Sequence, residues 1–248
     1  MSTHPIGIDF GGTGIKAAPV DLATGEFAAE RERIDTPKNS TPEAVGDIMA
    51  ELVGRFPDSA GPVGVAVPGV VRRGVVLSAA NIDKSWIGAD ADQILTERLD
   101  RPVHVLNDAD AAGYAELQFG AAKGRDGLVI LTTLGTGIGS ALLWDGVLVP
   151  NSELGHLEID GHDAESRAAF SAREAENLSW EHWAKRLTTY YRTLERLFSP
   201  DLFVVGGGVS KKADKFLPLV DIDTEIIAAS LKNTAGIVGA AALSDRQD

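Results

Sequence analysis

The sequence lacks cysteine altogether, and this absence excludes two kinds of site. Neither a disulfide framework nor a thiolate zinc site can form, so we expect no zinc. A cysteine-free chain fits a reducing compartment, and residues 1–5 show no basic segment followed by an apolar run. No apolar stretch approaches the roughly 20 residues that a membrane span needs. We therefore predict a cytoplasmic protein with no membrane partner.

Basic residues are scarce relative to acidic ones, since 23 Lys and Arg stand against 36 Asp and Glu, a formal net charge of -13. A surface that binds nucleic acid in general neutralises phosphates with Lys and Arg. We therefore expect no nucleic-acid partner, and an anionic substrate would need a local basic patch. The 248 residues, 44% of them hydrophobic, suffice for one large core or two small ones.

A repeat is the most informative feature that is present. The tetrapeptide Gly12-Thr13-Gly14-Ile15 recurs about half a chain later as Gly135-Thr136-Gly137-Ile138. Each copy lies between two apolar runs of the kind that form strands: 6–10 and 15–20 around the first, 128–134 and 140–143 around the second. Two such units predict an α/β fold of two related domains that face each other across a central cleft.

Other segments support this alternation of strands and helices. Ser40 and Glu43 have capping-box spacing ahead of apolar residues at helical intervals, which predicts a helix beginning there. Short apolar runs predict strands, and stretches rich in helix formers predict helices. The strands are expected at 63–67, 103–106 and 202–205, and the helices at 109–118 and about 178–198. The polar segment 160–176 predicts a surface loop.

The glycine turns are interpreted as phosphate cradles, because a backbone without Cβ atoms can bring its N–H groups close to an anion. Simple hairpin turns are the alternative. Lys16 does not follow a glycine, as the lysine of a Walker loop does, and a dinucleotide-binding glycine motif must open a helix, whereas 15–20 reads as a strand. Asp9, just before the first turn, could hold Mg²⁺ through water or simply cap the turn.

A third glycine turn, Gly206-Gly207-Gly208, follows the strand predicted at 202–205. It suits the donor side of a site, with a plain strand-to-helix connection as the alternative. Beyond it lie Lys211, Lys212 and Lys215, which with Lys232 make a local basic cluster. These lysines fit either a track for a long polyanion or a solvated helix face.

Acid-base chemistry is expected from Asn107 and Asp108, at the end of a buried strand and the start of a helix, where α/β proteins commonly gather ligands. Asp108 is the candidate base, and helix capping is the alternative role for both residues. Segment 153–158, Glu-Leu-Gly-His-Leu-Glu, offers two carboxylates and an imidazole to sugar hydroxyls. Asn81 and Asp83 could add hydroxyl contacts beside the aromatic face of Trp86, although a tryptophan of this kind more often belongs to the core.

These pieces, in this order, resemble the ROK family of bacterial sugar kinases and repressors over nearly the whole chain, and within it the actinobacterial polyphosphate glucokinases. The motifs that carry the resemblance are Asp9-Phe10-Gly11-Gly12-Thr13, Pro68-Gly69-Val70, Asn81 to Trp86, Asn107-Asp108, Leu134 to Gly139 and Glu153-Leu154-Gly155-His156.

The resemblance implies an actin-like fold, with one domain of residues 1–108 plus about 236–248 and a second of residues 109–235. It implies that Asp108 is the catalytic base. The sugar ligands implied are Gly69, Asn81, Asn107, Asp108, Glu153, His156 and Glu158. The donor ligands implied are Asp9, Gly11, Gly12, Thr13, Gly14, Lys16, Thr133, Gly135, Thr136, Gly137, Gly207 and Gly208.

The chain departs from the family pattern in two respects. Typical members carry a cysteine-rich zinc motif after the Gly-His pair, and its absence here removes that zinc site together with the ligand role of His156. The family's repressors carry an N-terminal helix-turn-helix, whereas here the first phosphate motif begins at Ile6, so we expect no DNA-binding repressor.

The function that the resemblance implies is phosphoryl transfer from inorganic polyphosphate, and from ATP, to the 6-hydroxyl of glucose, with mannose as a second candidate acceptor. We expect a homodimer that needs Mg²⁺. An ATP-only hexokinase and a non-catalytic sugar sensor are the alternatives. An NAD-dependent oxidoreductase is disfavoured, because the first glycine turn does not open a helix and no residues suited to a hydride-transfer site stand out.

Overall fold

The computed structural model describes residues 4–244, which fall into two compact units. One unit comprises residues 4–115 and 234–244, and the other residues 116–233. The first boundary lies inside helix α3 (Asp108–Phe119), and the second lies just before helix α7 (Ala235–Ser244). No helix in the described part of the chain is long and apolar enough to cross a membrane.

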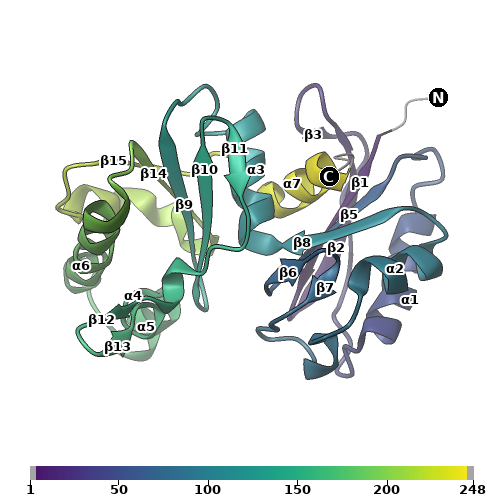
Figure 1. The fold of residues 1–248 in the computed structure, drawn as a ribbon, viewed down its shortest axis with the longest axis horizontal. Helices are drawn as coiled ribbons and strands as arrows, with labels where there is room; N and C mark the ends of the chain where they lie inside the picture. The colour runs from purple at the N-terminus through teal and green to yellow at the C-terminus, as the bar shows by residue number, and fades with distance from the viewer. Residues whose placement is uncertain (1–3, 245–248) are drawn as a thin grey trace. The chain divides into compact units, whose positions relative to one another are not determined.

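The first unit is built on a six-stranded sheet, in which β1 pairs antiparallel with β2 and parallel with β5, and β5 pairs parallel with β8 (Figure 1). Strands β3 and β4 both pair with β2. The strands are β1 (Ile6–Gly11), β2 (Gly14–Asp21), β3 (Glu26–Phe27), β4 (Glu32–Ile34), β5 (Val63–Val67) and β8 (Val103–Asn107). Outside the sheet lie α1 (Pro42–Gly54), α2 (Ala91–Leu99), η1 (Lys84–Trp86) and the ribbon of β6 (Val71–Arg72) and β7 (Val75–Val76).

Helix α7 packs directly on β1 and β5. This close approach explains two glycines inside buried strands, since a Cβ at Gly7 would collide with the carbonyl oxygen of Ile237, and one at Gly64 with that of Ala240. Glycine lowers strand propensity at these two positions, but its lack of a Cβ allows the backbone of α7 to pack directly against the sheet.

The second unit repeats this plan with a five-stranded sheet in the order β11-β10-β9-β14-β15 (Figure 1). An antiparallel hairpin, β9 with β10, again leads into parallel strands, β14 and β15. The strands are β9 (Leu128–Leu134), β10 (Ile138–Trp144), β11 (Val147–Val149), β14 (Leu202–Gly206) and β15 (Glu225–Ala228). A separate two-stranded ribbon consists of β12 (Glu158–Ile159) and β13 (His162–Asp163).

The helices of the second unit are dominated by α6 (Trp180–Phe198), which Ser179 caps and whose inner face buries Trp183, Leu187, Tyr190, Tyr191 and Leu194. Two short helices, α4 and α5, pack near it, and 3₁₀ turns complete the unit. Their bounds are α4 (Ala164–Ala168), α5 (Phe170–Ala175), η2 (Leu154–His156), η3 (Gly208–Lys215) and η4 (Leu217–Leu219). The turn η5 (Lys232–Thr234) spans the second boundary between the units.

Most predicted elements are confirmed, including both strand-turn-strand units, the strands at 63–67, 103–106 and 202–205, and the helices at 109–118 and 178–198. Two predictions are wrong. Helix α1 is capped by Thr41, whose hydroxyl accepts a hydrogen bond from Ala44 N, and not by Ser40. Segment 160–176 is not a loop, because Ala164 and Ala168 of α4 are buried and Phe170 of α5 packs against Trp183.

Candidate active site

The first glycine turn joins β1 to β2, and its flanking residues Gly11 and Gly14 are paired. Side chains from the next strand and loop hold it in place: Arg33 Nη2 donates to Thr13 O at 3.0 Å, and Thr36 Oγ1 donates to Gly11 O at 2.6 Å. The remaining turn residues, Gly12 and Thr13, are exposed. The turn thus has a braced backbone and an accessible tip, as a phosphate cradle requires.

Lys16 lies opposite Asp9 in the β1–β2 ladder, and its Nζ is 2.8 Å from Asp9 Oδ2. Both side chains are partly buried, at 31% and 25% exposure. This ion pair places a positive and a negative charge at the base of the turn. The other carboxylate oxygen of Asp9 lies toward the first turn of α7, where a Cβ at Gly236 would be 3.6 Å from it.

The predicted sugar residue Asn81 lies against the first turn. A Cβ added at Gly12 would be 2.8 Å from Asn81 O, so this glycine permits the approach. Asn81 itself has a left-handed backbone, with φ 60°, and its side chain is exposed. The structure therefore brings one predicted sugar contact next to a predicted donor turn.

The sequence left two roles open for Asn107 and Asp108, helix capping and acid-base chemistry, and the structure assigns the capping to Asn107. Asn107 Oδ1 accepts from the backbone N–H groups of Ala109 and Asp110, at 2.8 and 3.0 Å, and its Nδ2 donates to Gly69 O at 3.1 Å. Asn107 is buried and caps α3, whereas Asp108 is the first residue of that helix and is exposed. Asp108 is therefore accessible to a substrate, and Asn107 fixes the backbone from which it projects.

Trp86 belongs to the core. It is fully buried, its ring lies 5.4 Å from that of Phe10, and its Nε1 donates to Ser40 O at 2.7 Å. Of the two roles that the sequence left open for Trp86, the structure therefore confirms the core and excludes the aromatic face for a sugar. Asp83 caps η1 through Ser85 N, which accounts for its carboxylate.

The second glycine turn, in the other unit, joins β9 to β10 and is more tightly supported. Gly135 N donates to Gly137 O at 3.0 Å, and Ser171 donates from its backbone N to Gly135 O and from its Oγ to Thr136 O. Gly207, with φ +81°, lies against Leu134 at the end of β9, where a side chain would collide. Two of the three predicted donor turns therefore meet, and Thr133 pairs with Gly206 beside them.

Four side chains gather beside this second turn: Glu153, His156, Asp163 and Glu165. His156 Nδ1 lies 2.9 Å from Asp163 Oδ2, and His156 Nε2 lies 3.9 Å from Glu153 Oε2. Glu165 Oε2 accepts from Ile138 N at 2.9 Å, directly after the turn. The predicted residue Glu158 is exposed on β12, opposite Asp163 in the ribbon, and its role stays a prediction.

The environment shifts two pKa values in this cluster upward. Burial raises the pKa of Glu153, with the nearby Glu165 carboxylate acting in the same direction and His156 opposing it. The hydrogen bond to Asp163, followed by the charges of Glu165, Asp163 and Glu153, raises the pKa of His156. Both shifts favour the protonated forms of these two groups, and an imidazole beside a carboxylate can together donate to and accept from hydroxyl groups.

Sequence reasoning missed Asp163 and Glu165, because it assigned their segment to a loop. Their ligand atoms and one from His156 all lie within 4.8 Å of one another, so these three residues could also surround a metal ion. A shallow pocket of about 340 Å³ joins Asp163, Glu165, Thr136 and Ser171. The usable signal was the Asp163 capping position ahead of Glu165, which marks the start of α4.

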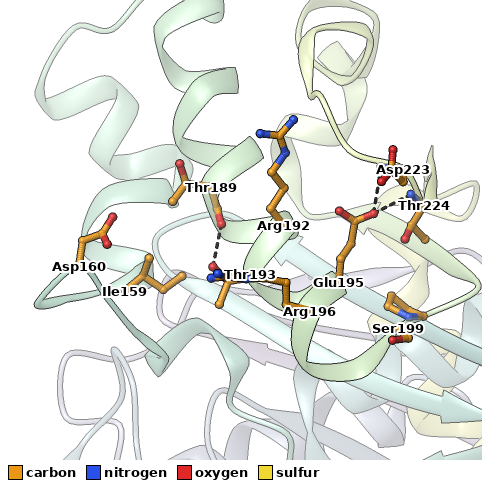
Figure 2. Close-up of a pocket in the computed structure, with 11 residues that line it drawn as sticks. Ile159, Asp160, Thr189, Arg192, Thr193, Glu195, Arg196, Ser199, Asp223 and Thr224 are labelled. Carbon is orange, nitrogen blue, oxygen red and sulfur yellow. Dashed lines mark hydrogen bonds between the residues drawn. The ribbon is translucent and has the colours of Figure 1, made fainter.

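A larger pocket, of about 750 Å³, lies along α6 in the same unit and contains none of the predicted site residues. Figure 2 shows that the side chains of Thr193 and Glu195 are hydrogen-bonded to other residues of the pocket. Thr193 donates to Thr189 O, and Glu195 accepts from the backbone N–H groups of Asp223 and Thr224. Size alone therefore does not mark the reactive part of this unit.

The chain matches the model of the ROK family over residues 5–168. The chain belongs to the ROK family. Polyphosphate glucokinase from Mycobacterium tuberculosis is 51% identical over 97% of this chain and 91% of that protein, and the same-named protein from Mycobacterium leprae is 50% identical over 96% of this chain and 74% of that protein.

Solved ROK structures agree with this membership. The inorganic polyphosphate/ATP-glucomannokinase from Arthrobacter sp. strain KM superimposes with a TM-score of 0.92 at 53% identity, covering 98% of each chain. The ROK glucokinase from Streptomyces griseus, solved with glucose and AMPPNP, gives a TM-score of 0.80 at 27% identity, covering 97% of this chain and 98% of that one. The predicted α/β class and actin-like sugar-kinase fold are confirmed.

Proposed function

We propose that this ROK protein is a polyphosphate glucokinase, which transfers a phosphoryl group from inorganic polyphosphate, and also from ATP, to the 6-hydroxyl of glucose. Glucokinase activity is supported by 51% identity over 97% of the chain to a polyphosphate glucokinase. Mannose is a proposed second acceptor, supported by the glucomannokinase relative.

The geometric observation that carries the proposal is the position of Glu165. Its Oε2 holds the backbone N–H of Ile138 at the end of the second glycine turn, and the same carboxylate acts on the pKa of both Glu153 and His156. A turn suited to phosphate and a group suited to sugar hydroxyls therefore share one side chain. Phosphoryl transfer needs donor and acceptor held close together, which such an arrangement favours.

We assign the chemical roles as follows. Asp108 accepts the proton of the attacking hydroxyl, since phosphoryl transfer asks the protein for positioning, charge neutralisation and a proton acceptor. In the second unit, Glu153, His156 and Glu165 bind sugar hydroxyls, and in the first unit Asn81 is assigned a sugar contact. The two glycine turns hold donor phosphates through backbone N–H groups. Asn107 contributes by fixing α3, from which Asp108 projects.

Mg²⁺ fits the first turn, because Asp9 has one oxygen engaged by Lys16 and a second that can receive a water of the hydrated ion. When bound with the donor, the ion would offset phosphate charge. We expect activity to need Mg²⁺ and to survive zinc chelators, because the chain has no thiolate to build a zinc site.

The choice of donor is argued from charge and from relatives. Lys211, Lys212 and Lys215 are exposed on η3, immediately after the Gly207 turn, and could follow a chain of phosphates. ATP as a second donor is supported by the polyphosphate/ATP-using relative and by the AMPPNP-bound glucokinase. Cytoplasmic location and a homodimer remain predictions, of which light scattering on the purified protein tests the second.

The experiment that tests this function is a matrix of acceptors and donors. Purified protein is incubated with glucose, mannose or fructose, each with ATP or with nucleotide-free polyphosphate, and sugar phosphate is quantified. We expect product from glucose with both donors. If glucose phosphate forms with ATP but not with polyphosphate, the protein is an ATP-dependent hexokinase. If no pair of donor and acceptor gives product, a sugar sensor is indicated.

A further inference from the structure

His156 is an exposed side chain that needs an external restraint. It ends the three-residue turn η2, and its side chain is 57% exposed. A ring on so short an element can rotate, and either nitrogen could then face a ligand. The structure shows one orientation, in which Nδ1 lies 2.9 Å from Asp163 Oδ2 and Nε2 lies on the side of Glu153.

Asp163 is itself well fixed. Asp163 is paired with Glu158 in the β12–β13 ribbon. Its carboxylate oxygen Oδ1 accepts a hydrogen bond from Glu165 N at 3.1 Å and so caps α4. Its backbone carbonyl accepts from Ser166 Oγ at 2.6 Å. One carboxylate therefore uses one oxygen to begin a helix and the other to hold the imidazole.

We propose that Asp163 is a positioning residue for sugar recognition, which locks the His156 ring so that Nδ1 donates to Asp163 and Nε2 faces the sugar beside Glu153. The proposal rests on the proposed hexose kinase function. With Nδ1 committed, Nε2 and Glu153 Oε2, 3.9 Å apart, form a pair that can engage one hydroxyl or two neighbouring hydroxyls of one hexose.

The carboxylates around His156 also affect its protonation. Asp163, Glu165 and Glu153 all raise the pKa of the imidazole, and the hydrogen bond that the imidazole donates to Asp163 is the largest cause. In the neutral ring, Nε2 accepts a hydrogen bond from a hydroxyl, and in the protonated ring it donates one. In both forms the orientation comes from Asp163.

The test separates positioning from helix capping by the choice of substitution. Asp163→Ser keeps a short oxygen that can cap α4 but cannot reach His156. Asp163→Asn keeps an acceptor for Nδ1–H at similar reach while removing the charge. Ser179→Ala is the matched control, because Ser179 caps α6 in the same unit through His182 N and contacts none of the clustered side chains.

Two readouts are measured on the full-length protein. Steady-state kinetics gives KM for glucose and, separately, KM for polyphosphate. Nitrogen-15 spectra of the imidazoles, with His156 assigned by comparison with His156→Gln, report which ring nitrogen carries the proton. For Asp163→Ser we expect glucose KM to rise about tenfold to a hundredfold, polyphosphate KM to stay unchanged, and the His156 signals to show mixed tautomers. Asp163→Asn should restore most of the glucose KM and the Nδ1–H tautomer.

Three outcomes would overturn the proposal: a glucose KM for Asp163→Ser that matches Ser179→Ala, unchanged His156 signals in that variant, or wild-type ring signals that collapse with a chelator and return with zinc. The last would mean that a metal ion orients the ring. A wild-type protein that phosphorylates no hexose would refute the kinase function, and the ring spectra would still decide whether Asp163 locks His156.

Discussion

Glu165 Oε2 lies 2.9 Å from Ile138 N, so a side chain from helix α4 closes the backbone at the end of the second glycine turn. Ile138 is almost fully buried, and a Cβ at the neighbouring Gly137 would collide with the same carboxylate. The Glu165 carboxylate therefore bonds to the turn backbone at Ile138 and can approach it because Gly137 has no side chain.

This contact predicts that Glu165→Ala lowers the free energy of unfolding by about 1–3 kcal/mol, because the Ile138 N–H loses its acceptor in a poorly hydrated place. Glu165→Gln retains an acceptor oxygen and should keep most of the stability while weakening glucose binding. Urea unfolding and glucose calorimetry measure the two effects. Equal stability of the alanine and glutamine variants would refute the structural part.

The cap that Asn107 provides for α3 gives a second prediction. Replacing it with Ala removes the cap of α3 and leaves Gly69 O without its donor, which should cost about 0.5–2 kcal/mol from the cap alone. Because Asp108 projects from the next position, kcat should fall with stability. Asn107→Ser, which keeps an oxygen that can cap the helix and adds no charge beside Gly69 O, is the control and should lose less stability. Thermal unfolding of the two variants decides this, and an alanine variant as stable as wild type would contradict it.

These two contacts also mark the limit of sequence reasoning. The hairpins around Gly12 and Gly135 were predictable, since apolar runs and turn glycines are local signals. The bond between Glu165 and Ile138 joins residues 27 positions apart, and no local pattern encodes it. Segment 160–176 was wrongly predicted to be a surface loop for the same reason. Its alanines are buried because α4 packs against α6, a contact with a segment that the local sequence does not reveal.

A similar competition explains the misplaced cap of α1. Ser40 and Thr41 are adjacent hydroxyl residues, and either could begin the helix. The structure uses Thr41, because Ser40 is committed elsewhere: its Oγ accepts from Asp83 N and its carbonyl accepts from Trp86 Nε1. Those partners are far away in sequence, so spacing alone could not decide between the two residues.

The pKa of His156 predicts a pH dependence of stability. Its folded-state pKa is raised above 6.5, so its contribution is fully present below pH 6.5 and is lost as the pH rises through the folded value. The effect should be small, because the side chain is more than half exposed. Urea unfolding from pH 6.5 upward should therefore show a shallower decline for His156→Gln than for wild type. Parallel curves for the two proteins would contradict the shift.

The lysines after the third glycine turn predict a difference between donors. Lys211→Ala combined with Lys212→Ala should raise KM for polyphosphate more than KM for ATP, because a long polyanion engages more positive charges. High salt should have the same bias. The double replacement of Lys123 and Lys185, which are also exposed in this unit, is the matched control. If both pairs change polyphosphate use equally, the lysines on η3 do not form a track.

The central claim, phosphoryl transfer from polyphosphate to glucose with Asp108 as base, is tested most directly by one measurement. Glucose 6-phosphate formation from nucleotide-free polyphosphate is followed for wild type and for Asp108→Asn, after both are shown to be folded and to bind glucose. The account predicts steady product from wild type and a turnover lower by about 10² or more in the variant, because the proton acceptor is lost. Near-normal turnover by Asp108→Asn, or no product from wild type, would contradict it.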